Sequence, residues 1–254
     1  YDTNEIMYTK LKTGGANYDV IIPSDYMIGK LVEEDMLAPL NFDNIPNYQY
    51  IDEQFKNRNY DPDNLYSVPY TWGTVGIIYN TKYVTEPVDS WSLLWDEAYK
   101  GKILMFDNSR DAFAISQLLL GQDVNTTSTA DLDAASQKLA EQKDLVQDYI
   151  MDQVFGKMEH EEAWIAPYYA GDYLTMLENN ENLAFCFPKE GYNLFIDAMC
   201  IPKNAQNKEA AEKYINFLCD PEIMAANLDF LGYSAPASEA KQYMDEELVA
   251  SEIA

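Results

Sequence analysis

The stretch YDVIIPSDYMIGKLVEEDML at residues 18–37 decides the fold class of this chain. Its first five residues, YDVII at 18–22, form an apolar, β-branched run that is typical of a buried strand. Pro23 and Ser24 end that run, and the apolar residues after them recur at a helical spacing. A strand that leads directly into an amphipathic helix is the first half of a βαβ unit.

The same alternation continues along the rest of the chain. Further strands are predicted at Gly76–Tyr79, Ile103–Phe106, Leu183–Phe187 and Leu194–Ile201. Helices are predicted at Glu5–Leu11, Ser90–Trp95, Arg110–Leu120, Asp131–Lys143 and Glu209–Cys219. One more helix is predicted from the N-cap and first-turn proline of Asp220-Pro221 to Gly232. Strands that alternate with helices predict an α/β protein with a mostly parallel sheet.

Charge and composition exclude several classes of protein. The 254 residues include 17 basic and 43 acidic side chains, a net charge of -26, and only two of the basic residues are arginines, Arg58 and Arg110. Nucleic acid is therefore excluded as a partner, because phosphate recognition depends on Lys and Arg. A hydrophobic content of 47% excludes a disordered chain. The single histidine, His160, argues against a His-based zinc site or a serine-type triad.

Polar residues that follow the predicted strands are the candidates for a site. Ligands of open α/β sheets bind beyond the carboxyl ends of the strands, where this chain places Ser24, Tyr26, Asn108 and Asp111. Helix capping explains Ser24 and Asn108 as well as a ligand contact does, and the two roles are compatible. Asp197 lies in a largely apolar stretch, where a carboxylate needs a partner, and an external cation fits better than the scarce basic side chains.

Aromatic side chains form the second half of the pattern. Six of them stand near predicted strand ends or turns: Tyr26, Trp72, Tyr168, Tyr169, Phe195 and Tyr233. Such rings belong either to the core or to the wall of a ligand site. Rings would suit a sugar and carboxylates a metal, whereas the two together suit an aliphatic chain that carries ammonium groups, because cation–π contacts and charged hydrogen bonds then act on the same ligand.

At these residues the chain resembles the polyamine-binding (spermidine/putrescine) solute-binding proteins of bacterial ABC importers. The likeness runs from about Asn4 to Gly232 and rests on the order and spacing of several stretches. They are NEIMYTKLKTGGANYDVIIPSDY at 4–26, YSVPYTWGTVGIIYN at 66–80, DSWSLLW at 89–95, YKGKILMFDNSRDAF at 99–113, FPKEGYNLFIDAMCIPKNAQNKEAAEKYINFL at 187–218 and LGYSAP at 231–236.

The resemblance implies an α/β protein with the two-lobed, periplasmic-binding-protein-like fold of type II. Lobe 1 is expected at residues 1–75 and 197–241, and lobe 2 at 76–196 and 242–254, with the ligand clamped between them. Family members extend before Tyr1 and beyond Ala254, so the fold is expected to be truncated at both ends.

The resemblance also assigns site residues. The ligand-binding positions that it implies are Ser24, Tyr26, Asn108, Asp111, Tyr168, Phe195, Asp197 and Tyr233. Asp111 and Asp197 match carboxylates that bind amines, and Asn108 stands where the family's spermidine binder has an aspartate. The asparagine removes one negative charge from the site. Tyr168 and Phe195 match tryptophans of that binder, so two rings of the site are smaller. The resemblance implies no catalytic residue, cofactor or metal.

A binding protein is thus expected, rather than an enzyme. It would bind spermidine or putrescine and deliver it to the permease of an ABC importer, from the periplasm or the outer face of the cytoplasmic membrane, with a lipid anchor as one option. Two alternatives stay open. One is a receptor of the same fold for a sugar or a metal; the other is a glycan hydrolase with Asp111 and Asp197 as acid and base.

Overall fold

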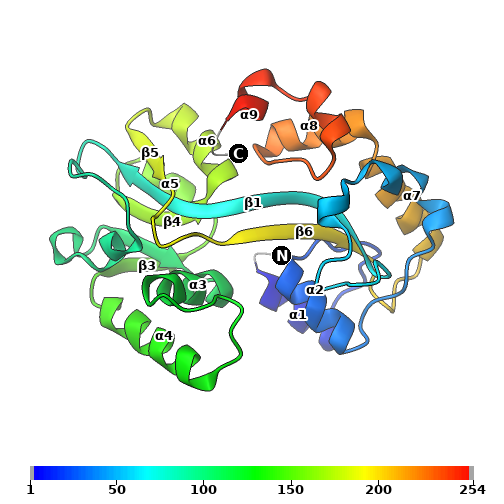
Figure 1. Ribbon diagram of the computed structural model, residues 1–254, viewed down its shortest axis with the longest axis horizontal. Helices are drawn as coiled ribbons and strands as arrows, with labels where there is room; N and C mark the ends of the chain where they lie inside the picture. The colour runs from blue at the N-terminus through cyan, green and yellow to red at the C-terminus, as the bar shows by residue number, and fades with distance from the viewer. Residues whose placement is uncertain (1–2, 252–254) are drawn as a thin grey trace. The chain divides into compact units, whose positions relative to one another are not determined.

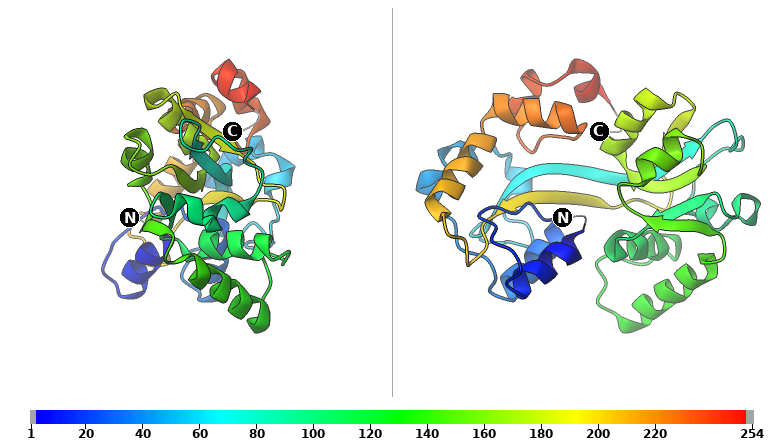
Figure 2. Two further views of the ribbon diagram at one scale, coloured as in Figure 1. Left: turned by 90° about the vertical axis from the view of Figure 1, so that its left-hand side faces the viewer. Right: turned by 180° about the vertical axis from the view of Figure 1, so that it is seen from behind.

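The computed structural model describes residues 3–251 and divides into two compact units (Figure 1). Of these residues, unit 1 holds 3–73 and 195–251, and unit 2 holds 74–194. The chain passes into unit 2 within β1 (Ser67–Asn80) and returns at the start of β6 (Leu194–Cys200). These two strands pair, and Figure 1 and the right-hand view of Figure 2 draw them side by side.

The sheet of unit 2 is mixed, which corrects the expectation of a mostly parallel sheet. Its strands are β1, β2 (Ile103–Phe106), β3 (Val146–Ile150), β4 (Ile165–Tyr169) and β5 (Leu183–Cys186), in the order β3-β2-β4-β1-β5. β2 runs parallel to β3 and β4, but β1 is antiparallel to both β4 and β5. The chain enters β1 from unit 1, so no βαβ crossover within unit 2 precedes this strand.

Helices complete unit 2. They are α3 (Ser109–Leu119), α4 (Thr129–Gln142), α5 (Val154–Glu159) and α6 (Ala170–Asn179), with 3₁₀ turns at Trp91–Trp95 and Glu97–Tyr99. The predicted cap of the first 3₁₀ turn is confirmed, because Ser90 accepts a hydrogen bond from the backbone of Ser92. Trp91 is fully buried, and its indole N–H donates to the carbonyl of Gly191 at 2.8 Å. That bond holds the segment leading to β6 against the core of unit 2.

Unit 1 takes its helices from both ends of the chain. They are α1 (Asn4–Lys12), α2 (Asp25–Glu33), α7 (Lys208–Leu218), α8 (Pro221–Leu231) and α9 (Glu246–Ala250), with 3₁₀ turns at Phe42–Asn44, Pro46–Tyr50, Glu53–Phe55 and Ser238–Gln242. The predicted boundaries of α8 are confirmed. Asp220 accepts hydrogen bonds from two backbone amides of the first turn, and Gly232 ends the helix in the left-handed conformation at φ 74°.

The predicted strand at Tyr18–Ile22 forms only isolated bridges. Ile21 exchanges both backbone hydrogen bonds with Cys200 of β6, and the Pro23 carbonyl accepts from Ala198. Pro23 has no N–H with which to return that bond, so the ladder is interrupted there. The segment still lies beside β6, which brings the residues after Pro23 to that strand.

Two details of the expected division differ from the structure. The units divide at 73/74 and 194/195 instead of 75/76 and 196/197, so Phe195 belongs to unit 1. The segment 242–251, expected in the second lobe, also belongs to unit 1, whereas 252–254 lie outside the described residues. Its Met244 is buried in the core of unit 1, and the Asp245 N–H donates to the Asp229 carboxylate at 2.9 Å. These two contacts hold the segment to unit 1.

Candidate ligand-binding site

Ser24 and Asp197 lie opposite each other in unit 1. An antiparallel bridge joins them, next to the bond that the Pro23 carbonyl accepts. Ser24 occupies the N-cap position of α2, as predicted, but its side chain caps no backbone amide. Its hydroxyl instead accepts from Asn4 Nδ2 at 3.1 Å. Asp197 is partly exposed on β6, so a carboxylate and a hydroxyl stand together at this point of unit 1.

Tyr26 follows in the first turn of α2, and its hydroxyl donates to Glu5 Oε1 at 2.9 Å. Glu5 is a partly buried residue of α1, a helix that packs on α2. Glu5 is not distinguished by its local sequence, because an acid in the first turn of a helix is ordinary. Unit 1 therefore has a second carboxylate beside a predicted site residue.

Two predicted aromatic residues of unit 1 meet at β1. The rings of Phe195 and Tyr233 pack edge to face, with centroids 6.3 Å apart. Gly73 of β1 lies directly beneath them: a Cβ atom at this position would come within 2.8 Å of Phe195 Cζ and 3.0 Å of Tyr233 Cε1. The absence of a side chain at Gly73 is what allows both rings to approach the strand.

Asn108 and Asp111 are brought together in unit 2, at the start of α3. Asn108 is the N-cap, and its Oδ1 accepts from the backbone of Arg110 at 2.9 Å. Asp111 is only 5% exposed. Three side chains donate to its carboxylate: Asn108 Nδ2 and the Tyr169 hydroxyl to Oδ2, each at 2.9 Å, and Asn193 Nδ2 to Oδ1 at 3.0 Å. Asn108 thus caps α3 through its Oδ1 and binds the Asp111 carboxylate through its Nδ2.

Tyr169, the neighbour of the predicted Tyr168, makes the bond to Asp111. Tyr168 is 2% exposed, and its ring lies against Phe106 and Phe155 at centroid distances of 5.6 and 6.4 Å. The pairing of Val75 with Tyr169 at the end of β4 holds Tyr169 in place. Burial and the adjacent Asp111 carboxylate raise the pKa of Tyr169 well above its usual value, so the phenol keeps its proton and serves as a donor.

The predicted residues divide between the units: Ser24, Tyr26, Phe195, Asp197 and Tyr233 lie in unit 1, and Asn108, Asp111 and the buried Tyr168 lie in unit 2. We define half-site 1 as Glu5, Ser24, Tyr26, Phe195, Asp197 and Tyr233, and half-site 2 as Asn108, Asp111, Tyr169 and Asn193. Each half-site joins a carboxylate to hydroxyl or amide groups and to at least one ring. Glu5, Tyr169 and Asn193 were not among the predicted contacts, although the sequence had marked Tyr169 as one of the rings near strand ends.

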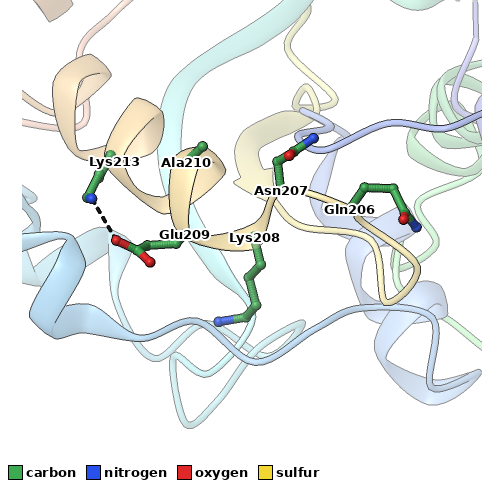
Figure 3. A pocket seen from close by; sticks show the side chains of 6 residues that line it. All are labelled: Gln206, Asn207, Lys208, Glu209, Ala210 and Lys213. Atoms are coloured by element: carbon green, nitrogen blue, oxygen red, sulfur yellow. Dashed lines mark hydrogen bonds and ion pairs between the residues drawn. The ribbon is translucent and has the colours of Figure 1, made fainter.

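A surface hollow at the start of α7 is distinct from both half-sites. Figure 3 shows the side chains that line its volume of about 380 Å³: Gln206, Asn207, Lys208, Glu209, Ala210 and Lys213. The Asp19 carboxylate already binds this helix start, since it accepts from the backbone of Gln206 and from the backbone and side chain of Asn207. The hollow contains none of the predicted site residues.

The chain belongs to the family of bacterial extracellular solute-binding proteins, which it matches over residues 16–250. It is similar to the spermidine/putrescine-binding periplasmic protein of Salmonella typhimurium, with 32% identity over 251 residues that cover 98% of this chain and 72% of that protein. The protein of the same description from Escherichia coli K12 is 33% identical at the same coverage. The predicted family is therefore confirmed.

Solved structures give the same result. A structure from Listeria monocytogenes, described as a spermidine/putrescine ABC transporter, superposes with a TM-score of 0.94 and 38% identity, covering 99% of this chain and 78% of that one. A spermidine/putrescine substrate-binding protein from Streptococcus pneumoniae gives a TM-score of 0.82 at 38% identity, covering 100% and 78%. The predicted α/β, periplasmic-binding-protein-like fold is confirmed.

Residues 3–251 include neither a membrane-spanning helix nor a metal-binding cluster of side chains. No helix in this part of the chain is both long enough and apolar enough to cross a membrane. The same residues contain no group of three or more His, Cys, Asp and Glu side chains arranged to hold a metal ion.

Proposed function

We propose that the chain binds a polyamine, spermidine or putrescine, and delivers it to the permease of an ABC importer. The observation that carries the proposal is the composition of the two half-sites. Each contains a carboxylate, Asp197 in one and Asp111 in the other, beside aromatic side chains. The names of the similar proteins support the same ligand class.

In this proposal the ammonium groups of one ligand bind to the carboxylates of both half-sites. A charged hydrogen bond contributes about 1.5–3 kcal/mol, and a cation over a ring adds about 0.5–2 kcal/mol. A bound ligand would favour a form in which the two units close on it, because only that form makes both sets of contacts. The ligand leaves chemically unchanged, so Asp111 and Asp197 act as ion partners and not as a catalytic acid and base.

The cellular location that we propose follows from the same reasoning. A receptor that serves an importer works outside the cytoplasmic membrane, and the similar curated proteins are described as periplasmic. We propose this location for the chain, with attachment through a lipid anchor as one form of it. Of the predicted contacts, Tyr168 is retained as a ring that supports Tyr169, since its own side chain is almost fully buried.

Calorimetric titration with spermidine and putrescine tests the proposal. The variants Asp197→Asn and Asp111→Asn keep the side-chain shape but remove the charge, and each is expected to weaken binding about 10- to 150-fold. Matched controls are Asp63→Asn in unit 1 and Asp133→Asn in unit 2, which remove the same charge from exposed positions. The controls should bind like the original chain.

Two outcomes would count against the proposal. If the original chain binds neither polyamine, while a sugar or a metal ion raises its melting temperature, the receptor serves another solute. If both controls weaken binding as much as Asp197→Asn and Asp111→Asn do, the two carboxylates act only through the overall charge, and the half-sites are not the binding residues.

A further inference from the structure

We infer that Glu5 is a positioning residue that makes the Tyr26 hydroxyl a hydrogen-bond acceptor toward the ligand; the inference rests on the proposed function. The Tyr26 hydroxyl donates to Glu5 Oε1 at 2.9 Å. A hydroxyl has one proton and two lone pairs. With its proton held by Glu5, the Tyr26 oxygen can accept hydrogen bonds but cannot donate one elsewhere.

Half-site 2 has the same arrangement, built from different residues. The Tyr169 hydroxyl donates to Asp111 Oδ2 at 2.9 Å, and the amides of Asn108 and Asn193 also donate to that carboxylate. The Asn108 Oδ1 is used by the backbone of α3. In each unit, therefore, a carboxylate accepts the hydrogen bond of a tyrosine hydroxyl, so the tyrosine oxygen acts only as an acceptor. In half-site 2 this oxygen already accepts from Asn108 Nδ2 at 3.5 Å.

This arrangement selects a class of ligand. An ammonium group has only donors, so it suits oxygen atoms that can only accept. A carboxylate has only acceptors and requires donors, and a sugar hydroxyl requires both. We therefore expect Glu5 to favour amines without a carboxylate over amino acids of the same length, independently of the total charge of the site.

The position of Glu5 at the start of α1 explains why this acid, and not another, has the role. Glu5 belongs to the first turn of α1, and a hydrogen bond between Asn4 and Ser24 connects that turn to the start of α2. The helix start thus carries one side chain to Ser24 and the next to Tyr26. A purely structural role would leave Glu5 as a first-turn acid that stabilises α1 through the helix dipole.

A double-mutant cycle separates these roles. Putrescine and ornithine, which is putrescine with an added carboxylate, are titrated into the original chain, Glu5→Gln, Tyr26→Phe and the double variant. We expect each single variant to weaken putrescine binding about tenfold. The double variant should be no weaker than either one, and Glu5→Gln should reduce the preference for putrescine over ornithine. The control Glu33→Gln removes an exposed charge from the same unit and should change neither value.

Several results would overturn the inference. One is a Glu5→Gln effect that persists in full when Tyr26 is already Phe, which would indicate a direct or long-range charge effect. Another is an unchanged preference between the two ligands. If Glu5→Gln lowers the melting temperature, Glu5→Asp takes its place in the experiment. Glu5→Asp keeps the charge but withdraws the carboxylate from Tyr26, and it must weaken putrescine binding as much as Glu5→Gln was expected to. Failure of the original chain to bind any polyamine would refute the proposed function instead.

Discussion

Replacing Gly73 by alanine tests whether close packing against β1 shapes half-site 1. The added Cβ would lie 2.8 Å from Phe195 Cζ and 3.0 Å from Tyr233 Cε1. Carbon atoms in contact are normally about 3.5–4.0 Å apart, so the Phe195 ring has to move by at least about 0.7 Å. Overpacking of this kind costs about 1–3 kcal/mol of unfolding free energy.

The same displacement should weaken ligand binding. A ring contact with an ammonium group contributes about 0.5–2 kcal/mol, so its loss corresponds to roughly a 2- to 30-fold higher Kd. Urea denaturation followed by circular dichroism measures the stability, and calorimetric titration with putrescine measures the affinity. We expect Gly73→Ala to lower both the urea midpoint and the affinity.

Gly29→Ala is the matched control, because it adds the same methyl group elsewhere in unit 1. Its Cβ would meet Tyr60 Cβ at 3.7 Å, an ordinary contact, and Gly29 lies within α2. This change should stabilise the chain by about 0.5–1 kcal/mol. Adding Phe195→Leu to Gly73→Ala removes the clashing Cζ and should restore part of the stability. If Gly73→Ala is as stable and binds as tightly as the original chain, the rings do not depend on the missing side chain.

Two other predictions concern stability. The Asp61 carboxylate is 3% exposed and accepts hydrogen bonds from the backbone of residues 65–67 and from the Ser67 hydroxyl. Asp61→Ala should therefore lower the free energy of unfolding, measured by urea denaturation, by about 2–4 kcal/mol. A loss under about 1 kcal/mol would contradict this prediction. Hydrogen bonds from Lys12, Tyr8 and Lys30 lower the pKa of Glu34 from 4.5 to about 2. The contribution of Glu34 to stability is therefore present above about pH 4.5 and is lost as the pH falls toward 2. Glu34→Gln should make the urea midpoint depend less on pH over that range. An unchanged dependence of the midpoint on pH would refute the assignment.

Helices with clear end signals could be predicted from the sequence. Asp220, Pro221 and Gly232 define α8 through local chemistry: an N-cap, a fixed φ and a left-handed C-cap. The strand Ile103–Phe106 was likewise predicted at its observed bounds, because a short apolar run ends at polar residues on one side. Such signals need no knowledge of the rest of the fold.

Strands that depend on their partners could not be predicted in the same way. β3 has exposed residues at its centre, so it lacks an apolar run, and β4 contains Pro167, which argues against a strand. Pro167 is tolerated opposite Ile77 in the antiparallel pair of β4 with β1. In the opposite sense, Tyr18–Ile22 has the pattern of a strand, but Pro23 interrupts its ladder with β6.

The candidate site shows a similar limit. Asp111 and Asp197 stood out because each follows or lies within an apolar run. The partners Glu5 and Asn193 did not, since nothing in their local sequence differs from an ordinary helix start or loop. Their roles come from contacts with residues 21 and 82 positions away along the chain, which only the folded structure brings together.

The composition of unit 1 has a consequence for biosynthesis. Its core combines early residues such as Ile45 and Val68 with late ones such as Ile215, Leu228 and Met244, whereas unit 2 is one continuous stretch. A ribosome that makes the chain from its N-terminus therefore releases all of unit 2 while most of this core of unit 1 is still missing. The early apolar side chains must then wait, open to chaperones or to aggregation, until about 50 further residues have emerged.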